Sequence, residues 1–327
     1  MTESGPNIKE ILAAREMLSR ETVETPVMRC RAIEQALDNG TEVIAKLEFL
    51  QRTGTFKARG ALTTLLDLSN EQLEAGVTAV SAGNHAIATA FAAKVVGASA
   101  KVVMTRSANP ARIAAARDYG AEVVLANDVH EAFEMAHSIR DNEGRFFVHP
   151  FEGPSIALGA GTLGLEICEQ VDDFDALVIP VGGGGLIAGV SNAVKQIRPQ
   201  IEVIGVEPEG ADSMHRSFAS GQPESIEQVA TIADSLGAPF AMPFSFALTR
   251  RCVDRLAMID DLALRKTMGF LFQHMNLAVE PACAATTAAL FGPLRESLAG
   301  KRVVLVFCGS NIDWASFSEQ VIFENVA

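Results

Sequence analysis

The sequence predicts an α/β protein with two lobes, each built on a mainly parallel sheet flanked by helices. Short apolar runs typical of strands alternate with helix-like runs over most of the chain. The length of 327 residues exceeds the usual size of a single core. Polar or glycine-rich turns follow several of the strand-like runs. Ligands bind at the carboxyl ends of strands in such folds, so we expect the site there, between the lobes.

The elements follow from local signals. Asn7 is a suitable N-cap for an opening helix, Pro110 suits the first turn of a later one, and Gly97 and Gly120 end helices. The expected strands are 41–47, 77–80, 101–104, 122–125, 176–180, 201–206, 253–259 and 303–307. The expected helices are 7–19, 57–66, 86–96, 110–119, 155–170, 186–197, 263–275 and 282–290. Residues 210–246 form a polar, proline-bearing region. We expect a small domain at 71–149 and a large domain made of 1–70 and 150–327.

Composition excludes several classes of protein. The formal charge of −13, without a basic block, argues against a nucleic-acid partner. No apolar run approaches the ~20 residues of a membrane span, and the polar first residues do not resemble a signal peptide, so we expect a cytoplasmic protein without a membrane partner. Five cysteines without CxxC spacing indicate reduced thiols and neither disulfides nor a zinc site.

Lys57 lies between a predicted strand and a predicted helix, within the stretch Thr53–Gly60. An aromatic neighbour, Phe56, and flanking glycines leave its amine poorly solvated, which lowers its pKa and makes it nucleophilic. Such a lysine can form a Schiff base. A surface lysine at the start of a helix is the simpler interpretation of this residue taken alone.

Four consecutive glycines, Gly182, Gly183, Gly184 and Gly185, also separate a strand from a helix. Their unobstructed N–H groups at a helix N-terminus predict a phosphate site. The same stretch matches GxGxxA, and Glu207 ends the next strand where a ribose-binding acid would lie. A nicotinamide dinucleotide site is therefore a rival hypothesis.

Two further turns carry polar groups after strands. Residues 81–85 read Ser-Ala-Gly-Asn-His and open a helix, so Ser81, Asn84, His85 and free N–H groups suit a carboxylate, with helix capping as the simpler interpretation. Cys308 follows the last predicted strand, where a buried apolar thiol is the usual structural outcome.

Taken together, these motifs resemble those of the fold-type-II pyridoxal-phosphate enzymes, whose fold is like that of the tryptophan synthase β subunit. The stretches TGTFKARGA, SAGNHA, GGGGLIAG and CGSN occur in the order and spacing of that family, most closely of its threonine and serine dehydratases (ammonia-lyases). The resemblance runs from about residue 25 to residue 313 and supplies the cofactor, pyridoxal 5′-phosphate.

The resemblance implies a role for each motif. Lys57 would hold the cofactor through a Schiff base and later remove the α-proton of the substrate. The expected contacts are Phe56 against the pyridine ring, Gly182 to Gly185 with Leu186 at the phosphate, Asn84 at the ring hydroxyl, Cys308 at the ring nitrogen, and Ser81 with His85 at the substrate carboxylate.

The implied reaction is dehydration of a β-hydroxy amino acid similar to L-threonine or L-serine, giving a 2-oxo acid and ammonia. Ala82 stands where similar racemases have a proton-donating serine, which favours dehydration over serine- or aspartate-type racemisation. Departures from the family motifs at Ile87, Ala160 and Ser235 leave the substrate open, and phenylserine, hydroxyaspartate or a hydroxyectoine-pathway compound would also suit. A β-replacement synthase, a nicotinamide-dependent oxidoreductase and a non-catalytic amino-acid sensor are rival functions for the same motifs.

The resemblance also bears on metal binding and assembly. Racemase-like relatives bind a divalent cation through an E-P-x-x-A-x-D pattern. Glu207 and Ala211 match this pattern, but Ser213 replaces its aspartate, so we expect no firm metal site. The family implies a homodimer.

Overall fold

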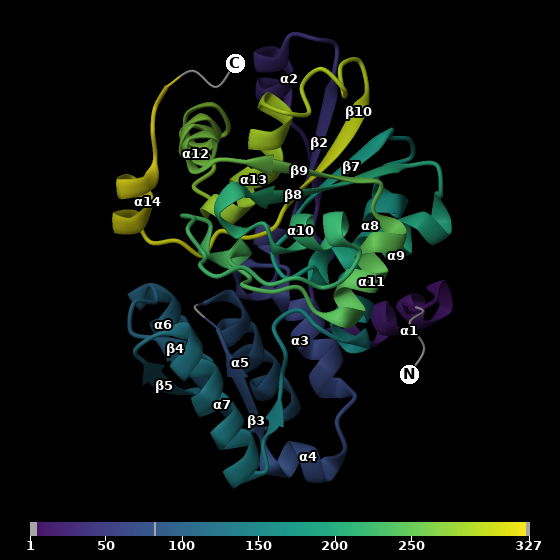
Figure 1. The fold of residues 1–327 in the computed structure, drawn as a ribbon. Helices are drawn as coiled ribbons and strands as arrows, with labels where there is room; N and C mark the ends of the chain where they lie inside the picture. The colour runs from purple at the N-terminus through teal and green to yellow at the C-terminus, as the bar shows by residue number, and fades with distance from the viewer. Residues whose placement is uncertain (1–4, 82, 325–327) are drawn as a thin grey trace.

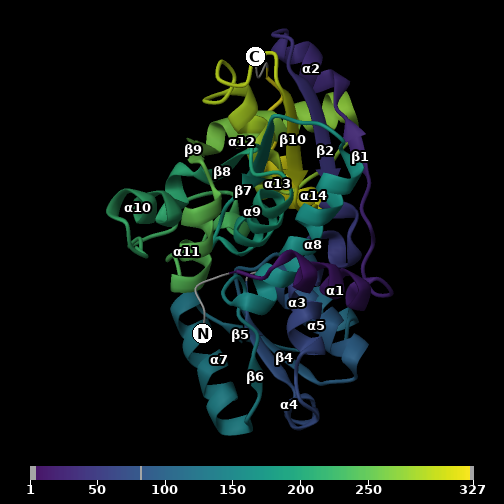
Figure 2. The ribbon, with the colours of Figure 1, turned by 90° about the vertical axis from the view of Figure 1, so that its right-hand side faces the viewer.

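The structure, a computed structural model, describes residues 5–81 and 83–324, and its strands form two sheets (Figure 1). One sheet has six strands in the order β1-β2-β10-β7-β8-β9 and the other has four in the order β5-β4-β3-β6. The two sheets lie in separate lobes, with β3 to β6 in the lower one (Figures 1 and 2). The predicted α/β class is confirmed. The domain boundaries at residues 70 and 150 stay a prediction.

The six-stranded sheet is parallel except at its edge, where β1 and β2 pair antiparallel. Its strands are β1 (Val27–Arg29), β2 (Glu42–Leu47), β7 (Ala176–Pro180), β8 (Glu202–Pro208), β9 (Arg255–Ile259) and β10 (Arg302–Phe307). Strands β7 and β10 are apolar and almost wholly buried, as expected of central parallel strands covered on both faces. Because the parallel strands end at one edge, the segments that follow β2, β7 and β10 come together there.

The four-stranded sheet is parallel throughout. Its strands are β3 (Val77–Val80), β4 (Ala100–Thr105), β5 (Glu122–Ala126) and β6 (Phe146–Phe147), and its helices are α5 (Asn84–Val96), α6 (Pro110–Asp118) and α7 (Val129–Glu143). One continuous apolar core joins this sheet to α3 (Lys57–Leu66), the helix that begins at Lys57. The first turn of α3 is therefore fixed by packing against both lobes.

Helix α4 (Asn70–Ala75) lies in the lower lobe with the four-stranded sheet (Figure 1). The remaining helices belong to the lobe of the six-stranded sheet. They are α1 (Ile8–Leu18), α2 (Arg31–Leu37), α8 (Pro154–Gln170), α9 (Gly185–Ile197), α10 (Ser213–Ser220), α11 (Pro243–Cys252), α12 (Asp261–Met275), α13 (Pro281–Phe291) and α14 (Trp314–Gln320). Helix α13 is buried along its whole length against β7 to β10. As predicted, Asn7 caps α1, where it forms a capping box with Glu10.

Every predicted strand and helix is present, with ends shifted by at most about two residues. The structure adds elements that were not predicted: β1, β6, α2, α4, α7, α10, α11 and α14. Residues 210–246, for which only a polar, proline-bearing composition was noted, contain α10 and the start of α11. The helix α10 is short and polar, so neither its composition nor its periodicity marks it.

A buried group of four charges connects β2, α3 and α8. The guanidinium of Arg59 donates to Glu48 at 2.8 Å and to Glu166 at 2.6 Å, and Lys46 Nζ lies 2.6 Å from Glu166. The four side chains are at most 4% exposed. Two cations and two carboxylates balance, which allows their burial only while all four remain.

The two lobes also meet away from the sheets. Asn109, which caps α6, donates to the carboxylate of Asp313 and at 3.0 Å to Ser316 Oγ, both at the start of α14. Trp314 beside them is the one tryptophan of the sequence and is 71% exposed. Within residues 5–81 and 83–324, no helix combines the length and apolarity needed to cross a membrane.

Candidate active site

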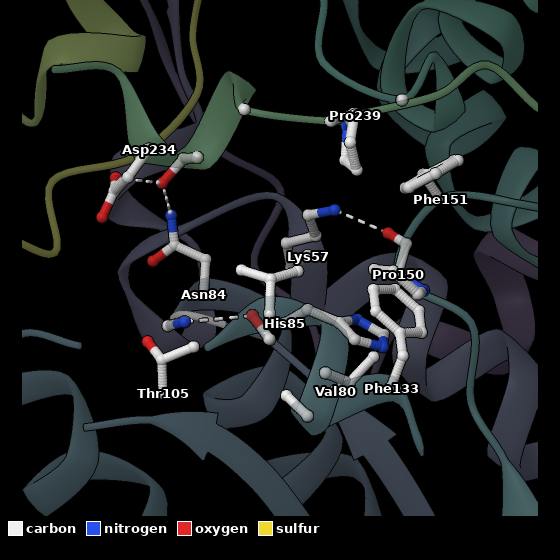
Figure 3. Close-up of a pocket in the computed structure, with 18 of the residues that line it drawn as sticks. Lys57, Val80, Asn84, His85, Thr105, Phe133, Pro150, Phe151, Asp234 and Pro239 are labelled. Atoms are coloured by element: carbon white, nitrogen blue, oxygen red, sulfur yellow. Dashed lines mark hydrogen bonds between the residues drawn. The ribbon is translucent and has the colours of Figure 1, made fainter. Parts of the chain in front are cut away.

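Two adjoining cavities lie where the lobes meet, and Lys57 lines both. Figure 3 shows the larger of the two, with Lys57 at its centre. One, which we name the glycine cavity, is lined by Gly182 to Gly185 with Phe56 and Cys308. The other, the outer cavity, encloses about 880 Å³ including its open mouth. Residues shared by both cavities are Lys57, Asn84, Phe151, Gly183 and Ser235. The structure thus brings all the sequence-predicted site residues to this junction.

Lys57 is the first residue of α3, so its side chain leaves the helix at the edge where β2, β7 and β10 end. Its Nζ donates to the carbonyl oxygen of Pro150 at 2.6 Å and lies 5.2 Å from the centroid of the Phe56 ring. Burial lowers the pKa of the Lys57 amine to about 8, an effect that Cys308 and Glu280 partly oppose. A substantial fraction of the amine is neutral near pH 8, as a nucleophile or base requires.

The glycine run connects β7 to α9, and glycine is needed there because neighbouring atoms leave no room for side chains. A Cβ on Gly183 would lie 2.2 Å from the Phe151 ring, one on Gly185 would lie 2.6 Å from the Phe151 carbonyl oxygen, and Gly184 has φ +92°. Within the part of the chain that the structure describes, no side chain caps the N-terminus of α9. Backbone N–H groups at a helix end with no side chain over them form an anion cradle.

Cys308 follows β10 and is buried in the glycine cavity. A hydrogen bond with Cys283 and burial raise the pKa of the Cys308 thiol well above its usual value, so the thiol is neutral. At the position predicted for the ring nitrogen, Cys308 would therefore present an uncharged group. Its contact with the ring stays a prediction.

Hydrogen bonds engage both the nitrogen and the oxygen of the Asn84 side-chain amide. Its Nδ2 donates to Glu280 at 2.8 and 3.0 Å and to Ser235 Oγ at 3.1 Å, and its Oδ1 accepts from Asn311 Nδ2 at 2.8 Å. Both amide hydrogens therefore have acceptors. To donate to a cofactor hydroxyl, as predicted, the amide must give up one of them, and the bond to the half-buried Ser235 is the more readily released.

His85 requires a correction. Its Nε2 donates to the carbonyl oxygen of Val148 at 2.9 Å, since a carbonyl can only accept. Burial lowers the pKa of His85 to about 3, so the ring is neutral and Nδ1 carries a lone pair. The side chain cannot donate to a carboxylate, in contrast to the predicted role, and only the backbone N–H of His85 suits a carboxylate.

Ser81 Oγ accepts from the N–H of Gly83 at 3.0 Å, and Ala82 lies outside the described residues.

Sequence reasoning missed the charged residues behind Asn84. Arg112 on α6 donates to Asn311 O at 2.7 Å, to Asp234 at 2.5 Å and to Glu280 at 3.3 Å. Its Cδ lies 2.3 Å from where a Cβ on Gly83 would be, which explains that glycine. Arg112 looks like a surface helix residue in the sequence, and Glu280 looks like a helix cap before Pro281. Neither pattern indicates their burial.

Glu207 has a structural role that the dinucleotide hypothesis did not anticipate. Its carboxylate accepts from the N–H groups of Met214 at 2.9 Å and His215 at 2.6 Å, at the start of α10. Burial raises its pKa to about 8. This carboxyl group is therefore occupied and cannot serve as a free ribose ligand.

Among the described residues, no cluster of three His, Cys, Asp or Glu side chains could hold a metal ion.

These cavities fit pyridoxal phosphate. The amine suits its aldehyde, the glycine cradle its phosphate, and the Phe56 ring and the neutral Cys308 thiol its pyridine. Fold and site together define an enzyme that uses this cofactor. The model of the family described as pyridoxal-phosphate dependent enzyme matches residues 18–309, and the chain belongs to that family.

Individual relatives agree with this assignment. The phenylserine dehydratase of Ralstonia pickettii is 52% identical over 98% of both chains, and the L-threonine ammonia-lyase of Thermotoga maritima is 40% identical over 84% of this chain and 68% of its own. Among solved structures, maize serine racemase has a TM-score of 0.90 at 31% identity, covering 97% of each chain. The predictions of fold type II, of pyridoxal phosphate and of a lyase of the dehydratase type are confirmed at the level of the family.

Proposed function

We propose that this protein is a dehydratase that converts a β-hydroxy amino acid into a 2-oxo acid and ammonia. The observation that carries the proposal is the position of Lys57, which lines both the glycine cavity and the outer cavity. An amine at this junction reaches a cofactor on one side and a substrate on the other. The names of the relatives divide between phenylserine, threonine and 3-hydroxyaspartate as substrates.

Pyridoxal phosphate, when bound, supplies an electron sink for the pair left when the α-proton departs. Residues Gly182 to Gly185 and Leu186 would hold its phosphate, and Phe56, Asn84 and Cys308 would surround its ring. The neutral Cys308 thiol gives the ring nitrogen no negative charge, which limits electron storage there. Limited storage favours prompt loss of the β-hydroxyl.

Lys57 Nζ would take the α-proton, since its lowered pKa leaves a neutral base near pH 8. The substrate carboxylate would lie at the N-terminus of α5, where no side chain among the described residues caps the helix and Gly83, Asn84 and His85 line the outer cavity. The C–O bond at the β-carbon then breaks, and the hydroxide leaves as water with a proton equivalent to the one that Lys57 removed. Hydrolysis of the resulting enamine or imine consumes that water again, so the balance is one amino acid to one 2-oxo acid and one ammonia.

The test couples chemistry to the cofactor. The purified protein should show a visible absorption band of bound pyridoxal phosphate and release ammonia and a 2-oxo acid from a β-hydroxy amino acid in equal amounts. Lys57→Ala should abolish release. A protein that binds no pyridoxal phosphate, or a Lys57→Ala variant with full turnover, would contradict the proposal.

A serine- or aspartate-type racemase is the second candidate, since solved structures of both kinds resemble this chain. Racemisation needs a proton donor on the face opposite the lysine, and alanine at position 82 has none. We therefore expect dehydration to exceed racemisation, measured as the ratio of 2-oxo acid to D-amino acid formed from an L-substrate.

Assembly and location complete the proposal. A homodimer is expected from the family resemblance, and light scattering on the eluted protein measures it. A cytoplasmic location is supported by the five cysteines, all of them free and buried, which suit a reducing compartment. Fractionation of the cells that make the protein tests the location.

A further inference from the structure

Three phenylalanine rings line one side of the outer cavity, and each comes from a different segment. Phe133 belongs to α7, Phe151 to the loop before α8, and Phe240 to the segment before α11. The centroid of the Phe240 ring lies 6.1 Å from that of Phe133 and 6.0 Å from that of Phe151. These distances are typical of favourable aromatic pairs.

Further aromatic contacts connect Phe151 back to Phe133 and so form a closed ring of contacts. The ring centroids lie 4.7 Å apart for Phe151 and His149, 6.0 Å for His149 and Phe147, 5.3 Å for Phe147 and His137, and 6.2 Å for His137 and Phe133, all nearly edge-to-face. We name these six side chains the aromatic cycle. Each ring is held by two neighbours, and members come from both lobes, so the wall is preorganised only when the lobes are together.

Among the described lining residues, no charged side chain lies on the aromatic side of the cavity. The cationic side chains lining the outer cavity are Lys57 and Arg112, and Arg112 is already paired with Asp234 and Glu280. In the cycle, His149 Nδ1 accepts from the N–H groups of Phe151 and Glu152, and burial lowers the pKa of His149 to about 4, which keeps its ring neutral. A carboxylate directed to this wall would meet no free cation among the described lining residues.

The position of the polar groups fixes the direction of the substrate. Its amino group must reach Lys57, and its carboxylate suits the α5 N-terminus near Asn84. Figure 3 shows Phe133 and Phe151 on one side of Lys57, and Asn84 with Asp234 on the other. The substituent on the β-carbon is left to point to the aromatic wall, beside the apolar Val80 and the half-exposed Val129.

Resting on the proposed function, we propose that the outer cavity selects β-hydroxy amino acids with an aryl group on the β-carbon, phenylserine being the simplest. The ring of the substrate would pack against Phe133, Phe151 and Phe240. The methyl group of threonine would leave most of that surface uncovered, and the carboxylate of 3-hydroxyaspartate would lose its hydration without gaining a partner.

The test compares kcat/KM of the holoenzyme for phenylserine, threonine and 3-hydroxyaspartate. We expect phenylserine to exceed threonine by at least about tenfold, the effect of burying an aryl ring instead of a methyl group. Equal values for phenylserine and threonine, with ammonia released from both, would overturn the aryl inference and leave the dehydratase standing. Release of ammonia from none of the three would instead contradict the proposed function.

Two variants place the selectivity in the cavity. Phe133→Leu and Phe240→Leu should lower the phenylserine-to-threonine ratio several-fold, while Phe272→Leu, an aromatic removed on α12 away from the cavity, should leave it unchanged. A ratio unchanged in both cavity variants would overturn the assignment.

Binding gives a readout apart from turnover. L-phenylalanine, which has no β-hydroxyl to lose, should bind at least about tenfold more tightly than L-alanine. Equal affinities would contradict the inference.

Discussion

The side-chain amide of Asn84 donates to both carboxylate oxygens of Glu280, at 2.8 and 3.0 Å, across the boundary between the two lobes. The same carboxylate accepts from Arg112 at 3.3 Å. Asn84 opens α5 in one lobe, and Glu280 precedes α13 in the other. The orientation of a predicted cofactor ligand is thus set by a buried charge of the opposite lobe.

Removal of Glu280 should therefore be costly. Burial raises its pKa, whereas Arg112 and Asn84 favour its charged form, and Glu280→Ala leaves Arg112 with one buried partner fewer. We expect a loss of about 3 kcal/mol in the free energy of unfolding, measured by urea titration. Asp141→Ala, in an exposed pair with Arg140, is the control and should leave the free energy of unfolding nearly unchanged. A Glu280→Ala variant as stable as this control would contradict the interpretation.

Lys57 should destabilise the cofactor-free protein. Its pKa falls from 10.5 to about 8 on folding, so below pH 8 the folded state holds a poorly solvated charge. Between about pH 8 and 10.5 the unfolded state binds more protons, and stability rises with pH. Lys57→Met should have a free energy of unfolding about 1 kcal/mol larger than that of the parent at pH 7, a modest difference because the amine faces a cavity. This difference in free energy should become smaller toward pH 10. A difference that grows with pH would refute this linkage.

The glycine run should not tolerate side chains. Gly183→Ala forces a methyl group against the Phe151 ring at 2.2 Å and should weaken pyridoxal phosphate binding by at least about tenfold, measured by titration of the cofactor-free protein. Gly161→Ala in α8 is the matched control, since its added methyl would lie 3.1 Å from Ile11 Cδ1 and at an ordinary contact distance of 3.6 Å from the carbonyl oxygen of Gly189. Equal cofactor affinities of the two variants would contradict the assigned cradle.

The buried charge group should respond strongly to loss of its central cation. Arg59→Met leaves Glu48 and Glu166 with Lys46 alone, and we expect a loss of roughly 3–5 kcal/mol in the free energy of unfolding. Arg29→Met removes an arginine whose side chain is 52% exposed, and it should leave the free energy of unfolding nearly unchanged. Thermal or urea unfolding of both variants measures the difference. If Arg59→Met lowered the free energy of unfolding as little as Arg29→Met does, the four buried charges would not be electrostatically coupled.

The strands and long helices could be predicted because hydrophobic periodicity is a local property. Strand 77–80 was predicted with its observed ends, and the helix after the glycine run differs by one residue. The sites at strand ends were predictable for a related reason. The glycine run and Cys308 closely follow β7 and β10, Lys57 begins the helix that comes after β2, and parallel strands end together.

The charged residues behind the site were not predictable, because their role depends on contacts over long separations. Arg112 and Glu280 are 168 positions apart, and no local pattern pairs them. The tautomer of His85 likewise depends on the distant carbonyl of Val148. The aromatic cycle joins residues from position 133 to position 240, so its closure exists only in three dimensions.

The junction between Asn109 and Asp313 provides the protein with a natural optical reporter. Trp314 follows Asp313 directly, and its ring stacks with Phe317 at 6.2 Å while most of its surface faces solvent. As the sequence contains one tryptophan, all indole emission originates beside this inter-lobe contact. Any separation of the lobes on substrate entry or product release would change the polarity around that single fluorophore, so the motion could be timed by stopped-flow emission without an introduced dye.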